Sequence, residues 1–211
     1  MTKEKRVINY YVLCNKLKTV IRTGWLNWHL KKDRLESVAE HIYGVQMLAI
    51  AMKSEYGYDV NLEKVIMMLA VHELGEIRIG DLTQFQISRD KKAKIEHKAV
   101  HKILKGILDG DKIEELFLEF DKRETPEAKF AYQCDKLECD LQAKLYHEEG
   151  IVDLSIQEDN ISFHNSRVQR LLKKYHNNWA KMWLKFGQEV YPYDENFRKV
   201  SEYAFINKIK K

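Results

Sequence analysis

The sequence predicts an all-α protein, a helical bundle that forms a single domain. Apolar residues recur at three- and four-residue steps along several long segments, which is the spacing of one face of a helix. Only two of the 211 residues are prolines, and no Pro-rich or Gly/Ser-rich linker interrupts the chain. With 45% hydrophobic residues, the chain is long enough to bury a core. We expect one domain over residues 1–211, with its core at about 10–150 and C-terminal helices at 163–211 packed on it.

The first part of the chain is expected to form two helices with a connection between them. Residues 5–21 carry a rough apolar stripe, and residues 22–29, with a glycine and two tryptophans, form the connecting segment. A stronger helix follows at 35–54, where apolar residues keep one wide face, and Gly57 offers a left-handed stop. His41 lies on that apolar face, so its side chain is expected to point inward.

The middle of the chain is expected to hold three more helices. An apolar helix, capped by the side chain of Asn61, leads into the stretch 66–81. The chain then loosens through residues 83–88. A charged helix is predicted at 89–108, and a short amphipathic helix at 111–121.

The longest helix is predicted to run from Pro126 to about Glu149. A Thr-Pro-Glu sequence is a typical helix start, and Gly150 is a typical stop. Two more helical patterns, rich in Leu, Trp and Tyr, follow at 166–186 and 195–209. These last segments carry no recognisable chemistry, and their aromatic residues are expected to pack.

Composition and charge exclude several classes of protein. The net charge of +4 is mild and mixed in sign along the chain, whereas duplex binding usually needs a strong basic patch. The three cysteines form neither a C-x-x-C pair nor an even set, so we expect reduced thiols. Neither a signal peptide nor an apolar run long enough for a membrane span occurs. The sequence thus predicts a soluble, cytoplasmic protein with neither a membrane nor a nucleic-acid polymer as partner.

Three predicted helices each carry a candidate metal ligand. His72 and Glu73 follow an apolar run, where burying both groups costs free energy unless something compensates them. A divalent ion is the simplest compensator, because imidazole and carboxylate are standard ligands, and the alternative is a pair that faces water. Asp135 is a mid-helix acid that must be paired or bound to a cation if it is buried. The alternative is an exposed acid that pairs with Lys136 or another nearby lysine. His41 is also a candidate, although a histidine on an apolar face is more often a hydrogen-bonded core residue.

Two other metal motifs are weaker. His97 and His101 are four residues apart, which is ligand spacing, but the lysines around them favour a solvated face. The sequence His72-Glu73-x-x-Glu76 resembles the His-Glu-x-x-His helix of zinc proteases, but Glu76 stands where that motif requires its second histidine.

In chain order the stronger candidates are a histidine, an adjacent His-Glu pair and a distant aspartate. This arrangement resembles that of the HD-domain metal-dependent phosphohydrolase superfamily, whose members order their ligands as His, His-Asp and Asp. Over about residues 10–150, four motifs are similar to those of its 5′-deoxynucleotidase branch. They are Arg22-Thr-Gly-Trp25, Glu36-Ser-Val-Ala-Glu-His41, His72-Glu-Leu-Gly-Glu76 with Ile79-Gly-Asp81, and Asp135-Lys-Leu-Glu138.

The resemblance implies an enzyme with a fold of the HD-domain type. It implies a metal-dependent phosphoric monoester hydrolase that removes phosphate from deoxyribonucleoside 5′-monophosphates and forms a homodimer. The implied cofactor is a divalent ion, either Mn, Co, Fe, Ni or Zn. Its implied ligands are His41, His72, Glu73 and Asp135.

The resemblance also implies roles for residues beside the metal. Glu76 and Asp81 are implied to handle protons or to position the attacking water, and a carboxylate near such a site is a sensible general acid or base. Arg22 is implied to meet the phosphate, since a guanidinium suits forked contacts with it. Trp25 is implied to pack against the sugar or the base, which would favour deoxyribose by leaving no room for a 2′-hydroxyl.

One residue departs from the family pattern, because Glu73 stands where an aspartate is usual. Its extra methylene holds the carboxylate less firmly, and a displacement of about 1 Å can cost roughly a hundredfold in rate. Two alternatives therefore stay open. One is another nucleotide phosphohydrolase or phosphodiesterase of the same superfamily, acting on cyclic nucleotides or guanosine tetraphosphate. The other is a non-catalytic module that binds metal and nucleotide.

Overall fold

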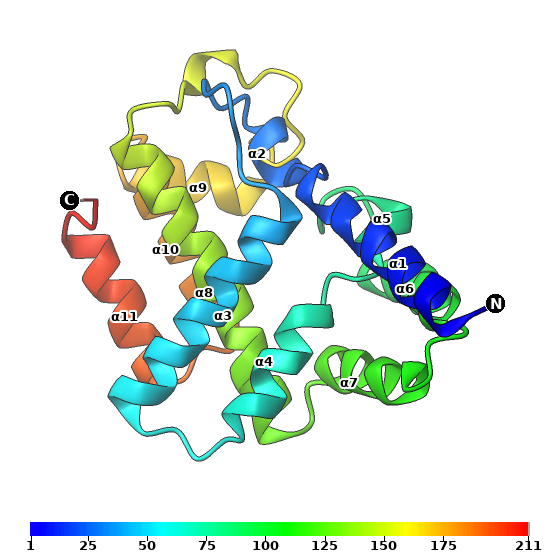
Figure 1. Ribbon diagram of the computed structural model, residues 1–211. Coiled ribbons are helices and arrows are strands. Elements are labelled where there is room, and N and C mark those ends of the chain that lie inside the picture. The colour runs from blue at the N-terminus through cyan, green and yellow to red at the C-terminus, as the bar shows by residue number, and fades with distance from the viewer. Residues whose placement is uncertain (211) are drawn as a thin grey trace. The chain divides into compact units, whose positions relative to one another are not determined.

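Helices make up the regular structure of residues 1–210, which are the residues that the computed structural model describes (Figure 1). In chain order they are α1 (Lys3–Cys14), a 3₁₀ helix (Asn15–Lys18), α2 (Thr23–Asn27), α3 (Val38–Tyr56), α4 (Leu62–Val71), α5 (Glu76–Ile79), α6 (Arg89–Leu104), α7 (Gly110–Lys122), α8 (Pro126–Glu148), a 3₁₀ turn (Leu154–Ile156), α9 (Ser166–Lys174), α10 (Trp179–Val190) and α11 (Glu195–Ile206). Within 1–210 the pairing of β type is an isolated bridge between Ile21 and Ser37. The all-α prediction is confirmed. No helix in this range combines the length and the apolar character that crossing a bilayer requires.

Two compact units make up the chain. Unit 1 contains Met1–Thr23 and Glu36–Tyr132, and unit 2 contains Gly24–Leu35 and the described residues from Gln133 onward. The boundary falls inside α8, whose first residues belong to unit 1. The single domain over 1–211, with its core at about 10–150, stays a prediction.

Helix α3 begins and ends with caps that its sequence encodes. The Ser37 hydroxyl accepts the backbone N–H of Glu40, and the Glu40 carboxylate accepts that of Ser37, which is a capping box. Gly57, at φ 66°, ends the helix in the left-handed conformation, as predicted. The buried residues fall at three- and four-residue steps: Val38, His41, Val45, Ala49 and Met52. His41 therefore faces the interior, as its position on the apolar face predicts.

Helix α4 packs beside α3 (Figure 1). Asn61 caps its start by accepting the backbone N–H of Lys64, as predicted. The helix ends at Val71, and the chain turns before the short α5. His72 and Glu73 thus stand at the end of the apolar helix, as predicted, in the turn that leads to α5.

Helix α1 buries a different face from the predicted stripe. Tyr10, Leu13 and Cys14 pack against an apolar cluster formed by Val71, Leu74, Val100, Ile103, Leu104 and Phe117. Four residues of the stripe are between 56% and 66% exposed, namely Val7, Ile8, Tyr11 and Val12, whereas Leu17 beyond α1 is 5% exposed. The predicted helix is confirmed over Lys3–Cys14, but its exposed side is apolar.

Unit 2 is built around tryptophans. Trp25 and Trp28 are each only 2% exposed, and the segment that carries them includes the short helix α2. The Trp25 ring centroid lies 5.3 Å from that of Tyr146 and 5.5 Å from that of Trp183. Trp28 lies 5.5 Å from Trp179. The predicted packing role of these C-terminal aromatic residues is confirmed.

The C-terminal helical pattern contains one break that its apolar residues do not reveal. His176 and Asn177 have φ values of 52° and 60°, which a right-handed helix cannot accommodate. The predicted pattern at 166–186 is therefore divided into α9 and α10, and the side chain of Asn178 caps the second helix. The three cysteines are free thiols, as predicted.

Candidate metal centre

The end of α4 fixes the ring of His72 in one tautomer. The last turn of a helix leaves backbone carbonyls without helical partners, and the Leu69 carbonyl lies 2.7 Å from Nδ1 of His72. Because a carbonyl oxygen can only accept, Nδ1 carries a proton, so in the neutral ring Nε2 holds the lone pair. A neutral imidazole held through its other nitrogen in this way is typical of metal-ligating histidines.

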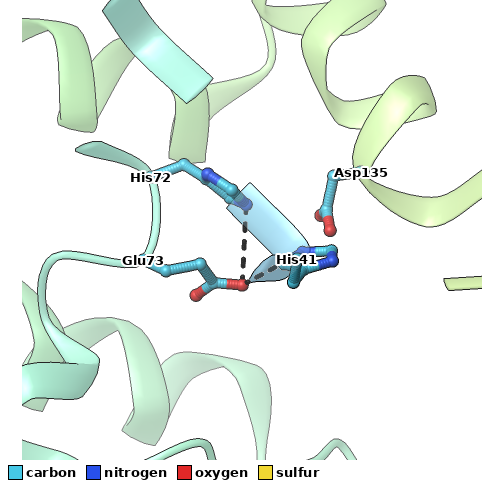
Figure 2. A group of neighbouring side chains, drawn as sticks. All are labelled: His41, His72, Glu73 and Asp135. Carbon is cyan, nitrogen blue, oxygen red and sulfur yellow. Dashed lines mark ion pairs between the residues drawn. The ribbon is translucent and has the colours of Figure 1, made fainter. Parts of the chain in front are cut away.

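Glu73 places one carboxylate oxygen near two imidazoles. Its Oε1 lies 3.6 Å from Nε2 of His72 and 3.9 Å from Nε2 of His41, as the dashed lines of Figure 2 show. His41 reaches this point from the buried face of α3. The ligand atoms of these three residues lie within 4.8 Å of one another, and they form a nitrogen and oxygen set that divalent ions favour. The longer side chain of Glu73 therefore still brings an oxygen to the histidines.

Asp135 lies in the middle of α8, in unit 2. It is only 2% exposed, and its Oδ2 lies 2.8 Å from Nζ of Lys136. Burial and pairing with Lys136, which the sequence offered as alternatives, thus occur together. Figure 2 draws Asp135 with His41, His72 and Glu73, and each of the four offers a ligand atom for a metal ion. Its role as a ligand stays a prediction.

Arg22 is fixed next to Glu73 by its own backbone and by carboxylates. Its N–H donates to the Glu36 carbonyl at 3.0 Å, which ties this segment to the start of α3. Its Nη1 lies 3.4 Å from Oε1 of Glu73 and 3.8 Å from Oδ1 of Asp81. Asp81 also accepts the Thr23 backbone N–H at 2.6 Å. The predicted phosphate-binding cation therefore lies beside the histidine and glutamate cluster, and Asp81 anchors it.

Glu76 is a carboxyl group with almost no access to solvent. Its residue is 1% exposed, and burial raises the pKa of Glu76 well above its usual range. The negative charges of Glu73 and Asp81 raise this pKa further, whereas Lys92 and Arg22 oppose the shift. Such a group keeps its proton more readily than an exposed glutamate, which suits a general acid.

Helix α6 contributes charged groups that sequence reasoning missed. Nζ of Lys92 lies 3.1 Å from Oε1 of Glu76 and 3.6 Å from Oε1 of Glu96. The charged composition of this helix indicates a solvated face, which conceals the two residues. Their four-residue spacing was the available signal, because it places them on one face of a helix.

The histidine pair of α6 does not converge on one point. His97 lies 2.9 Å from a carboxylate oxygen of Asp121, and His101 lies 3.0 Å from one of Glu114. The two imidazole side chains are 38% and 63% exposed. The solvated face predicted for this pair is confirmed.

Trp25 lies in the aromatic core of unit 2, where its residue is 2% exposed. Packing against the rings of Tyr146 and Trp183 accounts for this burial. Its implied contact with the sugar or the base stays a prediction.

Comparison with known proteins identifies the family. The sequence profile of the HD domain matches residues 14–179, a range that includes every predicted site residue from Arg22 to Asp135. The chain belongs to the HD-domain family. The resemblance to this family and the HD-type helical fold, both predicted from the sequence, are confirmed.

Individual relatives of this HD-domain chain carry more specific names. A 5′-deoxynucleotidase of Schizosaccharomyces pombe is 32% identical over 162 residues, covering 72% of this chain and 79% of that protein. A 5′-deoxynucleotidase of Danio rerio is 31% identical over 192 residues, covering 87% and 93%. Among solved structures, a conserved hypothetical protein from Pyrococcus furiosus is 29% identical with a TM-score of 0.58, covering 80% of this chain and 95% of that one. The similarity thus extends over most of each protein.

Proposed function

We propose that this HD-domain protein is a metal-dependent phosphoric monoester hydrolase that releases phosphate from deoxyribonucleoside 5′-monophosphates. The observation that carries this proposal is the position of Oε1 of Glu73. It has the imidazoles of His41 and His72 and the guanidinium of Arg22 within 3.4 to 3.9 Å. Ligands for a cation and a binding group for a phosphate therefore meet at one place. The relatives named 5′-deoxynucleotidase, at 32% and 31% identity, support the substrate class.

The residues proposed to hold the metal ion are His41, His72, Glu73 and Asp135. The fixed tautomer of His72 fits this role, because its Nε2 keeps a lone pair for a ligand bond. Burial in the middle of α8 supports Asp135, since an acid there is unfavourable without a compensating charge. A divalent ion such as Mn, Co, Fe, Ni or Zn supplies Lewis-acid stabilisation of phosphoryl charge and lowers the pKa of a water molecule.

The other site residues are proposed to bind the substrate and to transfer a proton to its leaving group. Arg22 makes forked contacts with the phosphate. Asp81 keeps the Arg22 segment in place by accepting the N–H of Thr23, and it also handles a proton or positions the attacking water. Glu76 gives its proton to the leaving 5′-oxygen, since burial favours the protonated form of its carboxyl group. Trp25 packs against the sugar or the base.

A phosphate-release assay tests this function. The protein is first treated with a chelator and then supplied with Mn or Co. The substrate panel contains deoxyribonucleoside and ribonucleoside 5′-monophosphates, cyclic nucleotides and guanosine tetraphosphate. We expect metal-dependent phosphate release from the deoxyribonucleoside monophosphates. Turnover of cyclic nucleotides or guanosine tetraphosphate alone would replace the substrate class, and turnover of no substrate would contradict the enzyme assignment.

The glutamate at position 73 favours a second candidate, a module that binds metal and nucleotide without turnover. Such a module shows nucleotide-dependent thermal stabilisation without product. The variant Glu73→Asp separates the two candidates. An inert parent that becomes active on this substitution supports the module, whereas an active parent rejects it. The short distances from Oε1 of Glu73 to both imidazoles support an active parent.

We also propose a homodimer in a reducing, cytoplasmic environment. The exposed apolar side of α1, with Val7, Ile8 and Tyr11 at least 60% exposed, supports association, because such patches often mark contact surfaces. The free cysteines support the compartment. Light scattering after size exclusion measures the mass. A species of 25.1 kDa alone would contradict the dimer.

A further inference from the structure

A lysine and a glutamate from α6 lie against the buried carboxyl group of Glu76. Nζ of Lys92 lies 3.1 Å from Oε1 of Glu76 and 3.6 Å from Oε1 of Glu96. The side chain of Glu76 is 0% exposed, whereas those of Glu96 and Lys92 are 14% and 24% exposed. The ammonium group therefore connects a fully buried acid to the half-buried face of α6.

Gly75, in the turn before α5, allows α6 to approach closely. A Cβ atom on Gly75 would lie 3.0 Å from Cγ and 3.3 Å from Cβ of Glu96. A side chain at position 75 would therefore require Glu96 on α6 to give way by a few tenths of an ångström. The glycine allows the backbone approach that brings the two charged side chains of α6 to the acid.

Charge explains why a lysine is needed at this place. Glu73, Glu76 and Glu96 each have a carboxyl oxygen within 4.8 Å of the others, so each carboxyl group disfavours ionisation of its neighbours. Burial lowers the pKa of Lys92, but the neighbouring glutamates outweigh this effect and raise the pKa above its usual value. The ammonium group thus stays charged and stabilises the negative charge that these carboxyl groups carry.

The two oxygens of Glu76 have different surroundings. Oε1 accepts the hydrogen bond from Lys92 at 3.1 Å. Oε2 is buried and has no hydrogen-bond partner among residues 1–210. A carboxyl group tied through one oxygen has its orientation fixed, and only the other oxygen is left to exchange a proton.

We propose that Lys92 is a positioning residue, which fixes Glu76 through Oε1 so that Oε2 is the atom that exchanges a proton with the substrate. Glu96 keeps Lys92 in place from the other side. This inference rests on the proposed phosphohydrolase activity and adds to it a residue of α6 that acts through Glu76.

The variants Lys92→Met and Lys92→Arg test this role, with Lys94→Met on the exposed side of α6 as the matched control. We expect Lys92→Met to lower kcat roughly a hundredfold, with KM changed less than about threefold and bound metal retained, because a misplaced catalytic group loses about this much. Lys92→Arg should recover most of kcat, since a guanidinium also donates to a carboxylate. Lys94→Met should behave as the wild type.

A double-mutant cycle distinguishes positioning from a general structural role. In the Glu76→Gln background, Lys92→Met should lower kcat no further, since its effect passes through Glu76. Additive losses, or a Lys92→Met variant with kcat within about threefold of the wild type, would overturn the proposal.

A variant that fails to fold and a wild type without activity can each be told apart from failure of this inference. If Lys92→Met does not fold, Glu96→Gln takes its place in the same cycle, with a smaller loss expected and the same absence of effect in the Glu76→Gln background. Wild-type protein without phosphate release from any substrate defeats the proposed function, and this inference with it. Wild-type activity that both Lys92→Met and Glu96→Gln leave intact defeats only the role of Lys92.

Discussion

Both units bury a carboxyl group, but the two groups have different neighbours. In unit 1, burial raises the pKa of Glu76 well above its usual range, and charged side chains surround it, with Nζ of Lys92 at 3.1 Å. In unit 2, burial likewise raises the pKa of Asp140, whose Oδ2 accepts a hydrogen bond from the Tyr193 hydroxyl at 3.0 Å. A Cβ atom on Gly187 would lie 1.9 Å from that oxygen.

The different neighbours indicate that Glu76 is a reactive acid, whereas Asp140 has a packing role. Asp140 is enclosed by a phenol and by the backbone of α10, so its carboxyl group fills space and accepts a hydrogen bond from Tyr193. Glu76 lies among groups whose charges are costly to bury, and perturbed acids in such surroundings are candidates for catalysis. The comparison predicts that changes at Glu76 affect turnover, whereas changes around Asp140 affect stability.

The largest effect is expected from Glu76→Gln. Loss of the proton-transfer group should lower kcat by roughly 10²–10⁴. The variant should still bind metal, because Glu76 is outside the proposed ligand set. Phosphate release and elemental analysis measure the two properties. The control Asp140→Asn should keep kcat within a few-fold of the wild type, and equal losses of kcat in both variants would remove the distinction between the two acids.

A smaller effect, on stability alone, is expected from Gly187→Ala. The added methyl group overlaps the Asp140 carboxyl group, and overpacking of this kind costs about 1–3 kcal/mol, occasionally more. Urea unfolding measures the loss. Gly24→Ala is the control, since a Cβ atom there meets nothing within 4 Å. Adding Asp140→Ala to Gly187→Ala should recover part of the stability, and an unchanged midpoint for Gly187→Ala would show that the site is less tightly packed.

The smallest effect is expected from a change of one pH unit on the unfolding free energy. Because its folded pKa is raised, Asp140 contributes stability that is fully present below its unfolded pKa of about 4 and is lost as pH rises through the folded pKa. The unfolding free energy of the wild type should therefore fall relative to that of Asp140→Asn above about pH 4. The slope is at most about 1.4 kcal/mol per pH unit. Urea unfolding of both proteins from pH 4 to 8 measures it, and parallel curves would contradict a raised pKa.

Local sequence signals correctly predicted the helix ends that depend on a few neighbouring residues. The cap at Asn61, the start at Pro126 and the stop at Gly57 each depend on a few neighbouring residues, and each is observed. The exposed face of α1 was missed. It depends on packing between segments distant in sequence, which periodicity alone does not report.

The candidate site was predictable in part for the same reason. His41 lies on an apolar helical face, and His72 and Glu73 follow an apolar run, so their burial could be anticipated. Lys92 could not be found this way, because it lies in a charged helix and its partner Glu76 belongs to another segment. The hints in the sequence are the four-residue spacing of Lys92 and Glu96 and the glycine at position 75, where another element comes close.

The metal content of Asp135→Ala tests most directly whether side chains from distant helices hold one shared ion. The variant, the wild type and Asp140→Asn, a control on the same helix, are loaded with Mn, desalted and measured by elemental analysis together with phosphate release. We predict stoichiometric metal and activity in the wild type and the control, and loss of both in Asp135→Ala. Stoichiometric metal in Asp135→Ala would contradict the proposed ligand set.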